Sequence, residues 1–155
     1  MNKFVMQGRW KEINGSITNP ENSGLRLVVN LCSESGKWES PVETLLSKRW
    51  APTKTDYRSW YVNRQGFKLG SLNTTLVASD IWVVNLLCKD KDNKVDDKAL
   101  SECVKKLSVL ARSDKGSVHF SSTALQEVPE LQDMLKKTFI EEGFSVYSYT
   151  EATKT

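Results

Sequence analysis

The stretch Ile81-Trp82-Val83-Val84-Asn85-Leu86-Leu87 decides the fold class, because it is apolar at every position except Asn85. A short run of this kind is typical of a strand at the centre of a sheet, with both of its faces covered. The run Leu25–Leu31 has the same character and follows the turn-forming residues 22–24. We therefore predict a buried strand at each of these two places.

The clearest helix signal lies between the two runs. Ser40 can cap the backbone amides of a helix, Pro41 suits the first helical position, and Glu43 completes a capping box. Apolar residues then recur at helical spacing as far as Trp50. This segment is predicted to be a helix that packs against a core.

The remaining elements follow from the same signals. They are a helix from about Thr53 to before Gly66 with Asp56 as its capping-box partner, strands at 68–78, 117–121 and 144–149, and helices at 96–112 and 128–142. The order β, β–α–α–β–β–α–β–α–β predicts a single α/β domain over residues 1–150 with a mixed, largely parallel sheet. A polar C-terminal tail is expected at 151–155.

Ligands of such sheets bind beyond the carboxyl ends of the strands. Three segments follow strands there, at 32–39, 88–94 and 121–128, and we expect them to form the site. The second segment begins near Lys89 and alternates charges of both signs. The first leads into the helix at Ser40, whose free amides would suit an anion unless Glu39 and Glu43 are their partners.

Composition and charge narrow the function classes. The 155 residues include 22 Lys and Arg against 19 Asp and Glu, and this net charge of +3 speaks against a dedicated nucleic-acid binder. No window is apolar enough for a membrane span, and Met1–Gln7 lacks the apolar stretch of a signal peptide. We expect a cytoplasmic protein (in the host cytoplasm if it is viral) with no membrane partner. The oligomeric state is left open.

Few residues are available for catalysis or metal binding. His119 is the only histidine and lies within a predicted strand, which argues against Ser–His–Asp chemistry and excludes a three-histidine metal site. Cys32, Cys88 and Cys103 match no metal-site spacing and are predicted to be buried free thiols. We predict no metal and no cofactor.

Other polar and aromatic residues have two interpretations. Asn30 and Asn85 interrupt apolar strands, so each is a structural bridge or a ligand contact. Among the tryptophans, Trp50, Trp60 and Trp82 fit core positions, whereas Trp10 and Trp38 lie near segment ends and are the candidates for stacking on a ring.

Several stretches resemble one family. Ile13–Thr18, Val28–Glu34 and Ser47–Pro52 stand where the macro domains have a Gly-Asp-Ile segment, a strand and loop that reach the distal ribose, and the first helix with its exit. With residues 81–86, 99–107 and 117–120, the resemblance covers about 13–149 and is strongest to small phage-type and terminal-ADP-ribose-hydrolase members. It implies a three-layer α/β/α fold. It also implies binding of ADP-ribose or a related nucleotide derivative, which some members of the family hydrolyse.

The resemblance also implies site residues. Lys89 stands at the place of the catalytic lysine in the subclass that uses a Lys and an Asp, and Glu127 is the carboxylate nearest to the place of that Asp. Tyr147 or Tyr149 would stack on adenine. The residues assigned to substrate binding are Asn30, Ser33, Glu34, Trp38, Ser121, Ser122, Thr123, Tyr147 and Tyr149.

Three departures from the family fall on ligand contacts. Ser16 replaces an adenine-binding Asp, Glu39-Ser40-Pro41 replaces one glycine-rich loop, and Ser121–Gln126 replaces the other without any glycine. Bulkier residues and an added carboxylate are expected to obstruct a diphosphate. Two hypotheses stay open: a hydrolase-like site for an ADP-ribose-like nucleotide or an ADP-ribosylated protein, and an inactive binding or protein-interaction module. The hydrolase would act on ADP-ribosyl groups or on ADP-ribose 1''-phosphate.

Overall fold

The computed structural model describes residues 8–151, which form one sheet with helices on both of its faces. The segment Met1–Gln7, where no signal peptide is expected, and all of the predicted tail except Glu151 lie outside the described residues. The strands are β1 (Trp10–Asn14), β2 (Arg26–Ser33), β3 (Leu72–Ala78), β4 (Ile81–Lys89), β5 (Ser117–Ser121) and β6 (Val146–Thr150). The helices are α1 (Pro41–Arg49), α2 (Pro52–Asn63), α3 (Asp97–Asp114), α4 (Ser122–Glu127), α5 (Pro129–Leu135) and the π-helical turn η1 (Lys136–Ile140).

The six strands form a single sheet in the order β1-β6-β5-β2-β4-β3. Every neighbouring pair is parallel except β3 and β4, which a short turn connects into an antiparallel hairpin. The two apolar runs lie side by side as β2 and β4 at the centre of the sheet, where β2 is buried from Leu27 to Ser33. The predicted mixed, largely parallel sheet is therefore confirmed.

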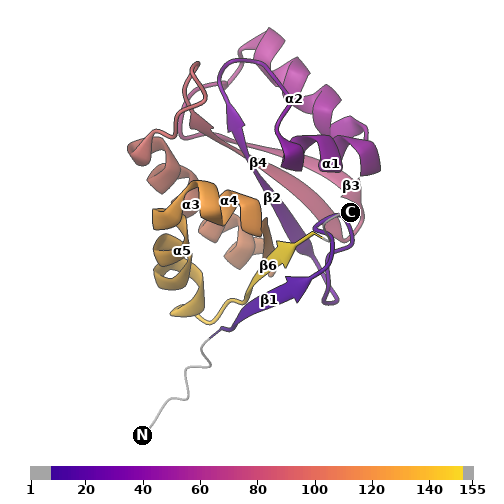
Figure 1. Cartoon of the computed structure of the whole chain (residues 1–155), viewed down its shortest axis with the longest axis vertical. Coiled ribbons are helices and arrows are strands. Elements are labelled where there is room, and N and C mark those ends of the chain that lie inside the picture. Colours follow the sequence, from indigo (N-terminus) through magenta and orange to yellow (C-terminus); the bar gives the residue numbers. More distant parts are fainter. Residues whose placement is uncertain (1–7, 152–155) are drawn as a thin grey trace, which may run out of the picture.

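Two apolar cores lie on opposite faces of the sheet and complete a three-layer α/β/α arrangement (Figure 1). Leu27, Val29 and Leu31 of β2 point toward α3, α4 and α5, whereas Val28 and Cys32 point toward α1 and α2. This alternation follows from the period of two along a strand. Both faces of the central strands are covered, as their continuous apolar character predicts.

Two helix starts agree with the sequence. Ser40 caps α1 and accepts a hydrogen bond from the Glu43 amide at 3.1 Å, and the predicted capping box is present. Asp96 caps α3 by accepting from the Ala99 amide at 2.9 Å. Both caps fix where the preceding loop ends, and the loop before α1 is part of the candidate site.

The capping box predicted at Thr53 and Asp56 is wrong. The Thr53 hydroxyl donates to the Trp50 carbonyl at 2.8 Å, and the Asp56 carboxylate accepts from Thr75 of β3 at 2.8 Å. The helix α2 begins at Pro52 without a side-chain cap. Asp56 therefore joins α2 to the sheet instead of capping it.

The segment after β5 also differs from expectation. Residues 121–128 were expected to form a loop, but Ser122–Glu127 form α4, capped by the Ser121 hydroxyl on the Thr123 amide at 3.2 Å. This segment contains no glycine and several good helix formers, which favour a helix over an open loop. The helix predicted over 128–142 begins at Pro129 and becomes π-helical from Lys136, and the strand predicted over 68–78 begins only at Leu72.

The predicted burial of the cysteines and the predicted strand position of His119 are confirmed. The three cysteines are buried free thiols, and His119 is fully buried. The His119 ring lies 2.7 Å from both the Ser117 and the Tyr149 hydroxyls and stacks on Tyr147 with ring centroids 4.5 Å apart. Among the described residues, no helix has the length and apolar character that spanning a bilayer requires.

Burial makes the stability of the protein depend on the protonation of His119. Burial lowers the pKa of His119 from 6.5 to about 3, so the unfolded chain binds the extra proton. The contribution of neutral His119 to the free energy of unfolding is fully present above pH 6.5. It falls as the pH drops toward 3, by about 1.4 kcal/mol per pH unit once His119 of the unfolded chain is protonated. Denaturant titrations between pH 7 and 5 measure this slope. The variant His119→Gln should have a clearly shallower slope; an unchanged slope would assign the effect to other groups.

Candidate functional site

The connections of the sheet place a crevice between β2 and β5. From β2 the chain runs through α1 and α2 toward β3 and β4, whereas from β5 it runs through α4 and α5 toward β6 on the other side. The two strands pair only from Arg26 to Val28 of β2, with Ser117 to His119 of β5. Beyond this point they separate at their carboxyl ends. Such a switch in direction is where open α/β sheets bind ligands.

A cleft of about 550 Å³ lies at these carboxyl ends. It is lined by Ser35, Lys37, Glu39, Ser40, Pro41, Glu43, Lys89, Lys91, Asp92, Asn93 and Glu127. A second cavity of about 30 Å³ shares Ser40, Pro41, Lys89 and Glu127 with the cleft and extends down to Asn30 and Thr123. All three loops predicted from the sequence contribute to these two cavities, although the third loop is a helix.

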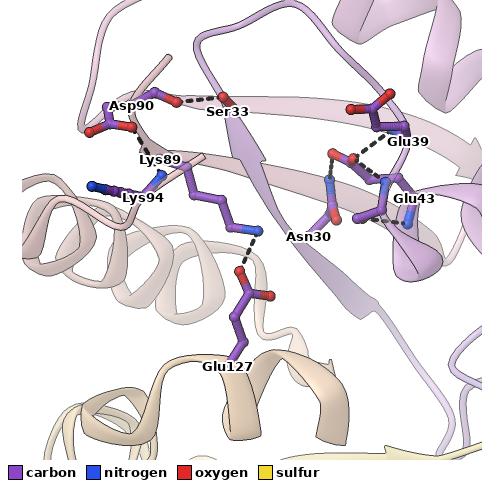
Figure 2. A network of polar contacts seen from close by, with 9 residues as sticks. Asn30, Ser33, Glu39, Glu43, Lys89, Asp90, Lys94 and Glu127 are labelled. Carbon is purple, nitrogen blue, oxygen red and sulfur yellow. Dashed lines mark hydrogen bonds and ion pairs between the residues drawn. The ribbon is translucent and has the colours of Figure 1, made fainter. Parts of the chain in front are cut away.

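Lys89 is the buried cation of the cleft. It ends β4, only 3% of its surface is exposed, and its Nζ lies 2.8 Å from Glu127 Oε1 of α4. Figure 2 shows the lysine side chain reaching away from the sheet toward this carboxylate. A buried ammonium needs a counter-charge, and Glu127 supplies it. The pair joins the end of β4 to α4 across the mouth of the crevice.

Glu43 is the buried anion on the other wall of the cleft. One carboxylate oxygen, Oε1, accepts hydrogen bonds from the Glu39 and Ser40 amides, each at 3.1 Å. The other, Oε2, accepts from Asn30 Nδ2 at 3.1 Å (Figure 2). Only 4% of the Glu43 surface is exposed. The amides of Glu39 and Ser40, just before α1, are thus occupied by a side chain of the protein.

A row of asparagines leads from Glu43 into the sheet. Asn30 Nδ2 also donates to Asn85 Oδ1 at 3.0 Å, and Asn85 lies in register with Asn73 of β3. Asn85 Nδ2 and Asn73 Oδ1 have no hydrogen-bond partner among the described residues. Asn30 and Asn85 therefore form the structural bridge that was one of their two interpretations, and Asn30 also reaches the smaller cavity.

Tyr57 of α2 fixes the loop that follows β2. Its hydroxyl donates to the Ser33 carbonyl and accepts from the Gly36 amide at 3.0 Å. Gly36 has φ of +82°, and a Cβ there would lie 2.6 Å from the Tyr61 ring, so the position requires glycine. The Ser33 hydroxyl donates to the Asp90 carbonyl at 2.7 Å, and the Glu34 amide donates to the Lys89 carbonyl at 3.0 Å. These bonds hold the first and second loops together beside the cleft.

The other predicted binding residues are separated by the fold. Trp38 lies in the core with its indole nitrogen donating to the Glu43 carbonyl at 2.8 Å. Tyr147 and Tyr149 are buried on β6 against His119. Ser122 lines a separate hollow with Thr150. The buried Ser121 caps α4, so of this group only Thr123 reaches the smaller cavity.

Sequence reasoning undervalued two residues. Glu127 was the nearest carboxylate in the sequence, but only the helical form of α4 presents it to Lys89. Glu43 was identified as a helix cap, and its burial beside the cleft is visible only in the structure. The available signal for it was a carboxylate three residues after an N-cap, in the first turn of the helix that follows the loop after a central strand.

The electrostatics of the cleft are mixed. Four carboxylates, of Glu39, Glu43, Asp92 and Glu127, outnumber the ammonium groups of Lys37, Lys89 and Lys91. Within residues 8–151, no group of His, Cys, Asp and Glu side chains has the arrangement of a metal site. The polar groups can donate to and accept from hydroxyl groups, and Lys89 with Glu127 can transfer protons, while the lining as a whole carries one more carboxylate than ammonium group.

The fold is shared with solved bacterial proteins. A Bacteroides thetaiotaomicron protein of unknown function has a TM-score of 0.84 at 22% identity, with 94% of this chain and 99% of that chain covered. A macrodomain protein from Streptomyces coelicolor has a TM-score of 0.84 at 21% identity, with 93% and 100% covered. Thermosipho africanus DarTG, solved in complex with ADP-ribose, has a TM-score of 0.70 at 7% identity, with 95% and 42% covered.

No family model and no curated protein matches the sequence. At identities this low, a structural likeness concerns the fold and not the ligand. It does, however, extend over 93% of this chain and the whole of the Streptomyces coelicolor macrodomain protein. The chain therefore has the macrodomain fold.

Proposed function

We propose that the cleft binds ADP-ribose or a related nucleotide derivative and that Lys89 and Glu127 hydrolyse a bond to its ribose. The observation that carries the proposal is the buried Lys89–Glu127 pair, 2.8 Å apart, which the cleft and the smaller cavity share. The pair lies where the direction of the sheet switches. The macrodomain fold supports the ligand class, since a protein of similar fold was solved with ADP-ribose.

The two side chains suit complementary steps of hydrolysis. Lys89 is held by burial and can donate a proton to the oxygen that leaves the ribose. Glu127 is partly exposed and can accept a proton from the attacking water. Water is thereby added across the bond, and the pair returns to its starting charges when Glu127 passes a proton to Lys89. The substrate would be an ADP-ribosylated protein or ADP-ribose 1''-phosphate.

A second candidate function is binding without catalysis. The excess of carboxylates in the cleft and the occupied amides of Glu39 and Ser40 favour it, because both weaken the attraction for a diphosphate. In that case the cleft would hold another ligand or a segment of a partner protein. The following variants separate the two candidates, since only a hydrolase depends on the identity of the Lys89–Glu127 pair.

Replacing Lys89 tests the hydrolase directly. Lys89→Ala should lower the release of ADP-ribose from an ADP-ribosylated protein, or of phosphate from ADP-ribose 1''-phosphate, by about 100-fold or more. Lys91→Ala is the matched control, because Lys91 is an exposed lysine of the same cleft. It should change the rate by no more than about threefold. Equal losses in both variants, or no turnover by the wild type on either substrate, would reject the hydrolase.

Replacing Glu127 separates its charge from its shape. Glu127→Gln keeps the size of the side chain but cannot accept the proton, so kcat should fall by about 10- to 100-fold with little change in KM. Glu127→Asp keeps the charge and should retain more of the rate than Glu127→Gln. Calorimetry with ADP-ribose gives the matching binding data, in which a Kd in the micromolar range is expected for the wild type. If Gln and Asp have equal effects, the charge of Glu127 does not matter for the rate, and its role as the proton acceptor is rejected.

Tyr57→Phe tests whether the loop after β2 must be held in place. The change removes the hydroxyl that donates to the Ser33 carbonyl and accepts from the Gly36 amide. The buried Gly36 amide then has lost its hydrogen-bond acceptor. Unfolding free energy should fall by about 1–3 kcal/mol, and affinity for the ligand should fall as well. Tyr61→Phe, whose ring also contacts this loop, is the control for loss of a hydroxyl. Denaturant titration and calorimetry of both variants measure the two effects.

A further inference from the structure

We infer that Glu43 is a specificity-determining residue that excludes a phosphate group from the α1 end of the cleft, so that the ligand presents an uncharged ribosyl group there. The inference rests on the proposed function and names the substrate class of the same site. The inference specifies how the ligand is oriented in the cleft and which of its groups lies near α1.

The geometry of Glu43 is that of a bound anion. Its carboxylate receives three N–H donors: the amides of Glu39 and Ser40, and the side chain of Asn30 (Figure 2). The next residue, Pro41, has no amide to offer. A phosphate that approached this end would have to displace the carboxylate to reach these donors.

Charge opposes that displacement. No ion pair joins Glu43 to a cation in the described part of the chain, and Lys89 is already paired with Glu127. An incoming phosphate would meet the negative charge of Glu43 in a buried place, where screening by solvent is weak. A neutral ribose has no such repulsion, and its hydroxyls can bond to the polar residues that line the cleft.

Glu43→Gln tests the inference because it removes the charge and keeps the capping-box acceptor. The neutral Asn30 side chain can rotate to match the new amide. Inorganic pyrophosphate is the probe, titrated by calorimetry into wild type, Glu43→Gln and Glu39→Gln. Glu39 lines the same cleft but is exposed, so Glu39→Gln makes the same change in charge while the buried Glu43 carboxylate stays in place.

We expect Glu43→Gln to bind pyrophosphate at least about tenfold more tightly than the wild type does, and Glu39→Gln to differ from the wild type by no more than about threefold. Equal affinities of Glu43→Gln and wild type, or an equal gain in Glu39→Gln, would overturn the inference. Should Glu43→Gln not fold, Glu43→Ala answers the same question, since the Ser40 hydroxyl still caps α1.

The pyrophosphate result is independent of catalysis. Titration of the same proteins with ADP-ribose then separates the two claims. If no protein binds ADP-ribose while Glu43→Gln gains pyrophosphate, the proposed function fails and the role of Glu43 stands. If the wild type binds ADP-ribose but Glu43→Gln gains nothing with either probe, the proposed function stands and the role of Glu43 is rejected.

Discussion

The separation of β2 from β5 is the constraint on which the rest of the molecule depends. Their pairing ends at Val28 and His119, because the chain leaves the two strands toward opposite sides of the sheet. The backbone groups beyond that point, and the side chains around them, must find other partners. On one side Lys89 forms an ion pair with Glu127, and on the other Asn30 donates a hydrogen bond to Glu43. Lys89 and Glu43, two charged groups of opposite sign, can therefore both stay buried beside the same cleft, each with its own partners.

The fold was predictable because its signals are local. The apolar runs of β2 and β4 and the capping box at Ser40 each act over a few residues, and the structure contains them as expected. The errors occur where distant partners decide the outcome. Asp56 bonds to Thr75 of β3 rather than to its own helix, and no local pattern contains that information. The segment 121–128 is predicted as a loop because of its place after a strand, although its residues favour a helix.

The sequence predicted where in the fold the candidate site lies, but not which of its residues contact one another. Lys89 follows a central strand, so its position at the carboxyl edge could be read from the sequence, whereas its bond to Glu127 depends on the orientation of α4. Burial is equally hard to read from a sequence. Trp38, Tyr147 and Tyr149 have the chemistry for stacking on a ring, yet packing places them inside the domain. Each of these assignments required knowing which face of an element is covered.

The row of asparagines restricts how this sequence can change. Glu43, Asn30 and Asn85 form a polar row from the cleft into the sheet, in which each side chain is hydrogen-bonded to the next, and Asn73 of the edge strand lies in register with Asn85. An apolar residue at one position alone would leave its neighbour unsatisfied, whereas replacing neighbours together would not. Their effects should therefore be non-additive. The positions of Glu43, Asn30 and Asn85 are expected to vary as a unit among homologues, so that the cap of α1 and the interior of the sheet evolve together.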